Sequence, residues 1–168
     1  MDTLSRRIIE YSYKNKLSHL GSCLTALPII KHIYDVKKDD EKFVLSCGHA
    51  GLALYAVLES KGLLDLDTFQ FSVHPDRDGV LFDCSTGSLG QGLPIAVGMA
   101  LADASKKVYC LISDGECAEG SIWEALAIKE KLCVTNLIVY VNINSFAAYE
   151  EVDSLYLINR LRAFCPSI

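Results

Sequence analysis

Residues 107–116 read KVYCLISDGE, and residues 136–146 read NLIVYVNINSF. Each stretch opens with an apolar run that is typical of a buried strand and ends in polar residues. The segment between them, residues 119–131, has the apolar spacing of a helix. A helix that joins two such strands indicates a parallel unit. Strands alternate with helical segments over the rest of the chain, which predicts an α/β fold with a mostly parallel sheet flanked by helices.

Two side chains with oxygen ligands, Asp114 and Asn144, follow these predicted strands and are thirty residues apart (144 − 114). Neighbouring parallel strands end at the same edge of a sheet, where open α/β sheets bind ligands, so we expect the two side chains to lie close together. Carboxylate and amide oxygens suit Mg²⁺, which takes its remaining ligands from phosphate and water. The pair therefore predicts a magnesium–diphosphate site. The alternative is a capping aspartate and an ordinary loop asparagine.

Length and composition restrict the classes of protein that fit. The chain has 168 residues, of which 51% are hydrophobic, and a formal charge of −5, which predicts one globular domain over residues 1–168. Without a basic stripe we expect no nucleic-acid partner, and the longest apolar runs are too short for a membrane span. Seven cysteines without a Cys-x-x-Cys pair favour reduced thiols and a cytoplasmic location.

The other elements follow from periodicity and from turn residues. Thr25 is expected to cap a helix that carries Pro28 in its first turn. Gly98 and Ala100 are expected to let their helix pack closely on the sheet. Residues 63–83 are polar and predicted to be irregular. The predicted helices are 3–16, 25–34, 50–60, 93–104, 119–131 and 150–164, and the predicted strands are 43–46, 107–112 and 136–141.

The segment DGECAEG at residues 114–120, with an asparagine thirty residues after its aspartate, resembles the thiamine-diphosphate motif of the transketolase family. The likeness extends to the separate N-terminal subunits of split transketolases. Four more segments resemble family motifs in the same order, namely SHLGS (18–22), FVLSCGHA (43–50), HP (74–75) and STGSLGQG (85–92). The resemblance implies a thiamine-diphosphate-binding fold of the diphosphate-binding type. It also implies transfer of a two-carbon ketol unit between sugar phosphates.

The resemblance implies a role for each residue of the metal motif. Asp114, the amide oxygen of Asn144 and the main-chain carbonyl of Phe146 would bind Mg²⁺, or Ca²⁺ in its place. Gly115 has no side chain, so that the diphosphate could approach the backbone closely. Glu116 belongs to the same expected set of cofactor-binding residues.

Three histidines lie in Gly- or Pro-marked turns that match family positions. By resemblance, His49 would donate a hydrogen bond to the diphosphate of the cofactor, while His19 and His74 would face its thiazolium ring and the substrate oxygens. Imidazole suits these tasks because it can donate or accept a proton near neutral pH. The backbone at Gly87 and Leu89 would contact the aminopyrimidine ring.

Two glutamates lie at family offsets of five and ten residues after Asp114. In the family, residues at the positions of Glu119 and Glu124 meet their mates across a subunit interface and connect paired active sites. We therefore expect a homo- or hetero-oligomer, joined through helices that carry apolar surface, residues 92–99 and 119–132.

The sequence departs from the family mainly in length. A transketolase site also needs a pyrimidine-binding domain, and the family continues well beyond the position of Asn144. We therefore expect a C-terminally shortened domain that is inactive alone and needs a pyrimidine-domain (C-terminal) partner subunit. Two alternatives stay open: a non-catalytic cofactor-binding or regulatory module, or a subunit of another thiamine enzyme such as a deoxyxylulose-phosphate synthase. A plain nucleotide-binding domain is disfavoured because neither a P-loop nor a dinucleotide fingerprint is present.

Overall fold

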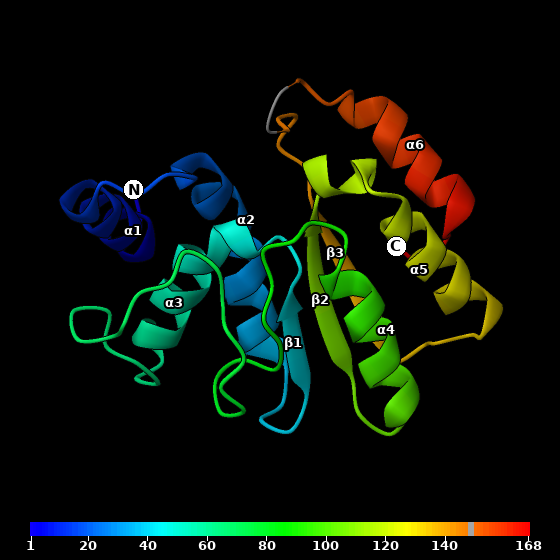
Figure 1. Ribbon diagram of the computed structural model, residues 1–168, viewed down its shortest axis with the longest axis horizontal. Helices are drawn as coiled ribbons and strands as arrows, with labels where there is room; N and C mark the ends of the chain where they lie inside the picture. The colour runs from blue at the N-terminus through cyan, green and yellow to red at the C-terminus, as the bar shows by residue number, and fades with distance from the viewer. Residues whose placement is uncertain (148–149) are drawn as a thin grey trace.

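A three-stranded parallel sheet forms the centre of the computed structural model, which describes residues 1–147 and 150–168 (Figure 1). The strands are β1 (Lys42–Leu45), β2 (Val108–Ser113) and β3 (Leu137–Asn142), in that spatial order. Val108 pairs with Lys42 on one side and with Leu137 on the other. The predicted parallel α/β architecture is confirmed.

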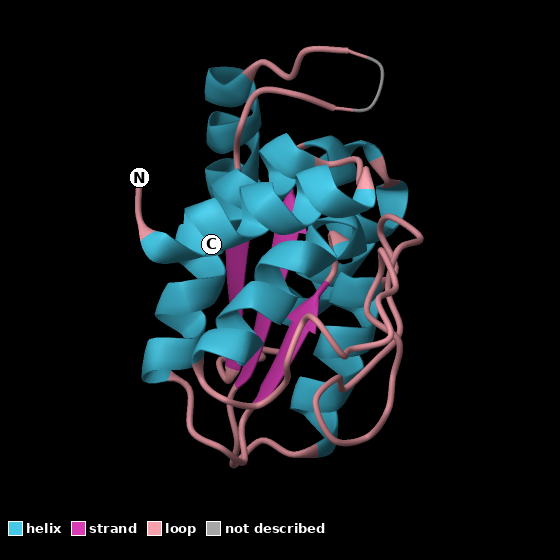
Figure 2. Ribbon diagram, turned by 90° about the vertical axis from the view of Figure 1, so that its left-hand side faces the viewer, coloured by secondary structure: helices cyan, strands magenta, loops and turns pink. Residues whose placement is uncertain are grey.

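Helices cover both faces of the sheet, so that each strand is buried on two sides (Figures 1 and 2). Along β2, Tyr109 and Leu111 belong to the core on one face, while Cys110 and Ile112 belong to the core on the other. This double burial explains why β2 reads as a continuous apolar run. The first face carries α1 (Thr3–Asn15), α2 (Leu20–Val36) and α3 (Gly51–Ser60), and the second carries α4 (Gly92–Ala102), α5 (Gly120–Lys131) and α6 (Ser154–Phe164).

Between α3 and α4, residues 61–91 form neither a helix nor a strand, as predicted for most of this segment. The segment is anchored by aromatic side chains, because Phe69, Phe71 and Phe82 pack on the Tyr55 ring of α3 at centroid distances of 5.1, 5.7 and 5.6 Å. This apolar packing holds the long connection against the first face of the sheet.

The start of α2 differs from the prediction. The helix begins at Leu20, after His19 in a left-handed conformation (φ +65°), and not after Thr25. Thr25 lies one turn inside the helix, where its hydroxyl donates to the carbonyl of Gly21 at 3.1 Å. A threonine that bonds the preceding turn in this way has the same sequence signature as a capping residue. Pro28 accordingly lies in the helix interior.

The start of α6 is also later than predicted. Asp153 caps the helix by accepting the N–H of Tyr156 at 2.9 Å, so that α6 begins at Ser154. Before it, Glu151 forms an isolated antiparallel bridge with Phe146, which keeps residues 150–152 extended beside the loop that follows β3.

The glycine that allows close packing of α4 is not the one expected. A Cβ on Gly98 would meet no atom within 4 Å, so Gly98 does not set the packing, although Ala100 is buried. A Cβ on Gly92 would lie 2.6 Å from Ser46, at the end of β1. The close contact therefore lies at the first residue of α4. No helix in the described part of the chain combines the length and apolar character needed to cross a bilayer.

Candidate functional site

The tips of β2 and β3 bring the two predicted oxygen ligands together. Ser113 pairs with Asn142 in the last register position of the two strands, so the residues that follow both strands leave the same edge of the sheet. The N–H of Asn144 donates to Oδ2 of Asp114 at 2.8 Å. The predicted juxtaposition of these two residues is thus observed directly.

The carboxylate of Asp114 is buried and satisfied mainly by backbone groups. Its Oδ1 accepts the N–H of Gly115 at 2.9 Å, and its Oδ2 accepts the N–H groups of Asn144 and Ser145 at 2.8 and 2.7 Å. The first of these bonds caps the short 3₁₀ helix η2 (Gly115–Ala118). The other two pin the loop after β3 onto the tip of β2. Asp114 is therefore both a capping residue, as in the alternative interpretation, and the organiser of this edge.

The loop after β3 turns sharply over Gly115. Ser145 has a left-handed backbone (φ +68°), and the amide oxygen of Asn144 accepts the N–H of Phe146 at 3.0 Å. A Cβ on Gly115 would lie 3.2 Å from Ala147 and 3.8 Å from the carbonyl oxygen of Phe146. The absent side chain of Gly115 thus makes room for this loop as well as for any ligand. We call Asp114, Gly115 and residues 144–147 the floor of the site.

The floor offers hard oxygen atoms. The described residues contain no group of three or more His, Cys, Asp or Glu side chains that could hold a metal. The available donors are instead one carboxylate, one amide oxygen and the main-chain carbonyl of Phe146. An ionised carboxylate has about four lone-pair sites, and three on Asp114 are taken, which leaves one on Oδ1. Such a donor set fits Mg²⁺ or Ca²⁺, with phosphate and water as the remaining ligands.

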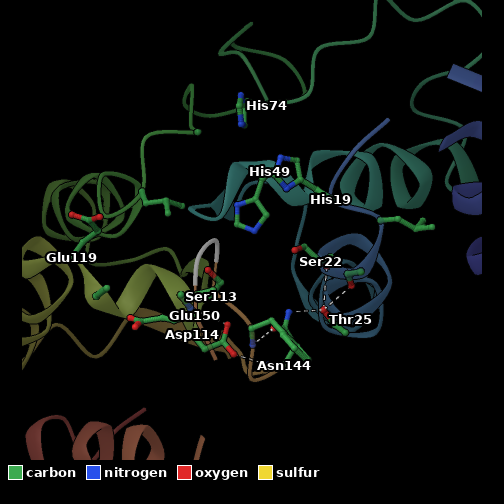
Figure 3. A pocket seen from close by; sticks show the side chains of 18 residues that line it. His19, Ser22, Thr25, His49, His74, Ser113, Asp114, Glu119, Asn144 and Glu150 are labelled. Carbon is green, nitrogen blue, oxygen red and sulfur yellow. Dashed lines mark hydrogen bonds between the residues drawn. The ribbon is translucent and has the colours of Figure 1, made fainter. Parts of the chain in front are cut away.

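Opposite the floor lie the three predicted histidines, which we call the histidine wall (Figure 3). His19 precedes α2, His49 lies in the 3₁₀ helix η1 (Gly48–Ala50), and His74 lies in the segment 61–91. The rings of His19 and His49 are 5.3 Å apart. Burial, followed by the charges of the other two histidines, lowers the pKa of His49, so its imidazole is neutral near pH 7.

The glycine-rich turn is fitted against His74. Gly87 has φ +131°, and a Cβ there would lie 2.7 Å from the His74 ring. The backbone of Thr86 donates to the carbonyl of Pro75 at 3.1 Å, which ties the turn to the histidine-bearing loop. Both Gly87 and Leu89 line the cleft.

Glu116 does not line the cleft, which corrects the expectation that it contacts the cofactor. Its carboxylate is fully buried behind the floor, where Oε1 accepts the hydroxyl of Ser46 at 2.5 Å and the N–H of Gly90 at 2.7 Å. Desolvation raises the pKa of Glu116, and these hydrogen bonds oppose that effect. The residue joins the glycine-rich turn to the ends of β1 and β2, so that its role in the described structure is to connect elements.

The two predicted interface glutamates separate in space. Glu119 is exposed at the rim of the cleft, whereas Glu124 is exposed on α5 and does not line the cleft. Trp123, between them, packs its ring against Phe164 at 5.4 Å and under the guanidinium of Arg160 at 3.8 Å. The tryptophan therefore anchors α6 to α5.

The cleft has a volume of about 850 Å³ and includes residues that sequence reasoning missed. Ser22 and Thr25 line it from the first turns of α2, because the helix begins earlier than predicted. Ala147 and Glu150 line it from the loop after β3, and Glu150 was assigned to the last helix. The available signals were the family motif SHLGS next to Thr25 and the polar loop that follows Asn144.

Comparison with known proteins agrees with this geometry. Residues 22–160 match the family model described as "Transketolase, thiamine diphosphate binding domain". The chain belongs to this family. The resemblance drawn from the sequence motifs is confirmed, and the domain is of the thiamine-diphosphate-binding type.

The transketolase relatives are longer than this chain. An apulose-4-phosphate transketolase subunit of Phocaeicola vulgatus is 33% identical over 177 residues, covering 89% of this chain and 62% of that protein. Human transketolase is 39% identical over 149 residues, covering 75% of this chain and 24% of that protein. The solved structure of transketolase from Leishmania mexicana matches with a TM-score of 0.62 and 27% identity, over 72% of this chain and 23% of that one. The chain thus spans less than two thirds of each relative.

Proposed function

We propose that this chain supplies the diphosphate- and metal-binding half of a transketolase active site, and that a partner with a pyrimidine-binding domain completes it. One observation carries the proposal: three histidines face Asp114 and Asn144 across a single cleft of about 850 Å³. The reaction would pass a two-carbon ketol unit from a ketose phosphate to an aldose phosphate.

The floor would hold the cation and, through it, the diphosphate. Asp114, the amide oxygen of Asn144 and the carbonyl of Phe146 would bind Mg²⁺ or Ca²⁺. His49, which is neutral near pH 7, can donate one ring N–H to a phosphate oxygen. Gly87 and Leu89, at the glycine-rich turn, present backbone groups that would contact the aminopyrimidine ring.

Thiamine diphosphate supplies the electron sink that permits a carbon–carbon bond of the ketose to break and re-form. The chain itself binds, orients and moves protons. His19 and His74 would hold the hydroxyl and carbonyl oxygens of the sugar by hydrogen bonds, since each imidazole can act as donor or acceptor. Glu119, at the rim of the cleft, would face the partner.

A partner is supported by the Phocaeicola vulgatus relative and by the exposed surface of two helices. The printed name of that relative makes it one subunit of an assembly. In this chain, Ile95 and Leu101 on α4 and Ile128 on α5 are large apolar side chains exposed to solvent. We place the interface of a homo- or hetero-oligomer on these helices, with Glu124 in it. Seven free thiols are compatible with assembly in the reducing cytoplasm.

Calorimetric titration of the purified chain with thiamine diphosphate tests the binding half. We expect saturable binding in Mg²⁺, none in a metal chelator, and none by Asp114→Ala. Absence of binding by the unmodified chain in Mg²⁺ would overturn the proposal.

Turnover tests the catalytic half. The chain is mixed with a pyrimidine-domain subunit, ketose phosphate and aldose phosphate, and ketol transfer is expected only in the mixture. Robust turnover by the chain alone contradicts the need for a partner. Cofactor binding without turnover in the mixture instead supports a non-catalytic module.

A further inference from the structure

Thr25, on α2, contacts both asparagines at the end of β3 from the wall of the cleft (Figure 3). Its Oγ1 lies 3.0 Å from Nδ2 of Asn142 and 3.3 Å from Nδ2 of Asn144. More than a hundred residues of sequence separate Thr25 from these partners, since the separation from Asn144 is 119 residues. Only the packing of α2 beside β3 brings them together.

The protons available to this cluster determine which way the amides point. A hydroxyl has one proton and two lone pairs. The proton of Thr25 is directed into its own helix, to the carbonyls of Gly21 at 3.1 Å and Ser22 at 3.3 Å. The hydroxyl can therefore only accept from the two asparagines, and both must present their NH₂ groups to it. The amide oxygen of Asn144 consequently faces the other way, toward the N–H of Phe146.

Asn142 extends this control to the position of Asp114. Asn142 is buried, and its main-chain carbonyl accepts the N–H of Asp114 at 3.0 Å. Its side chain is held by the same hydroxyl that orients Asn144. One oxygen atom on α2 thus fixes the end of β3, next to which both proposed side-chain ligands of the cation lie.

We propose that Thr25 is a positioning residue for the divalent cation, because it forces the oxygen of the Asn144 amide toward the ion and the NH₂ group away from it. The inference rests on the proposed function, in which that oxygen is a metal ligand. Valine in place of Thr25 has nearly the same shape and suits a helix, but it cannot accept a hydrogen bond. The amide could then turn its NH₂ group toward the ion.

The choice of metal gives a readout that a merely structural role would not move. Mg²⁺ demands near-octahedral geometry, whereas Ca²⁺ tolerates irregular ligand sets, so a misplaced amide should affect Mg²⁺ more. Losing an outer partner of a metal ligand typically costs about 10–100-fold in metal affinity. We expect Thr25→Val to raise the Mg²⁺ concentration for half-maximal cofactor binding by roughly that factor, and the Ca²⁺ concentration by less.

The experiment titrates thiamine diphosphate into the chain at a series of Mg²⁺ and Ca²⁺ concentrations. Thr25→Ser keeps the hydroxyl and should bind like the unmodified chain. Thr135→Val, a matched change at an exposed threonine before β3, should also leave binding unchanged. Thermal unfolding of Thr25→Val should stay near that of the unmodified chain.

Three results overturn the inference while leaving the proposed function intact. The first is an unchanged Mg²⁺ dependence in Thr25→Val. The second is an equal loss with both metals together with a lowered unfolding temperature, which marks a structural role. The third is a Thr25→Ser variant as weak as Thr25→Val. Failure of the unmodified chain to bind the cofactor with either metal overturns the proposed function instead.

Discussion

The floor and the histidine wall face each other across one cleft but are built in different ways. In the floor, Asp114 receives main-chain N–H groups from Asn144 and Ser145, and adjacent strands supply the frame. In the wall, His74 lies in the irregular segment 61–91, which is held mainly by aromatic packing around Tyr55. Directional hydrogen bonds fix atomic positions, whereas apolar packing is non-directional. The floor is therefore preorganised for an ion, and the wall depends on how its loops are anchored.

Removing the carboxylate of the floor should have the largest effect. Asp114→Ala leaves three main-chain N–H groups without their acceptor, which should lower the free energy of unfolding by about 2–4 kcal/mol. Metal-dependent cofactor affinity should fall by about a hundredfold or more, since even outer partners of a metal cost 10–100-fold. Urea unfolding and calorimetry measure the two quantities.

A surface aspartate provides the control for Asp114. Asp40 forms an exposed pair with Lys106 at 3.4 Å, and Asp40→Ala should change stability by less than about 1 kcal/mol. If Asp114→Ala were as stable as the Asp40 variant, the hydrogen bonds of the floor would not be what organises it.

The second-largest effect is expected at Glu116, which links floor and wall. Glu116→Ala leaves the hydroxyl of Ser46 and the N–H of Gly90 buried without an acceptor, and should cost about 2–4 kcal/mol. Glu116→Gln keeps one acceptor oxygen for both donors and should cost about 1 kcal/mol. Chemical unfolding measures both, and equal losses in the two variants would refute the hydrogen-bond explanation.

In the wall, the backbone at Gly87 should matter more than its exposure suggests. Alanine there combines a φ of +131° with a Cβ 2.7 Å from the His74 ring, so Gly87→Ala should cost about 1–3 kcal/mol and displace that histidine. Gly98→Ala, in a helix with open space around the new Cβ, should instead add about 0.5–1 kcal/mol. Thermal unfolding of both variants tests the contrast, which fails if the signs agree.

The smallest effect is expected in the pH dependence set by His49. Its folded-state pKa is lowered by burial, from an ordinary value near 6.5, so the unfolded chain binds more protons below that pH. The stability due to neutral His49 is therefore fully present above about pH 6.5 and declines as the pH falls toward the folded-state pKa. His49→Gln should flatten this slope in unfolding free energies measured from pH 5 to 8. A slope that is unchanged in the variant would assign the pH dependence to other groups.

The parts of the site that sequence reasoning placed well are those that follow strand ends. Asp114 and Asn144 were predictable because strands of a parallel sheet end at one edge, which does not depend on detailed packing. Glu116 was misplaced because sequence position next to Asp114 does not show which way a side chain points from a 3₁₀ turn. Its burial depends on Ser46 and Gly90, which come from other segments.

Helix starts were the least predictable part of the fold. Thr25 has the residue type of a cap, but the cap position is decided by the left-handed backbone of His19, which composition does not reveal. The same error hid Thr25 from the list of site residues. Glu150 was hidden in a similar way, since Asp153 and not a residue near 150 starts α6.

The sequence by itself determined the α/β class, the order of the elements and the strand tips that carry Asp114 and Asn144, because apolar periodicity and strand-end positions are local properties of the chain. Tertiary structure alone decided which hydroxyl orients the Asn144 amide and which carboxylate connects the glycine-rich turn. Those contacts join residues 26 to 119 positions apart, and only the packing of helices on the sheet sets their distances.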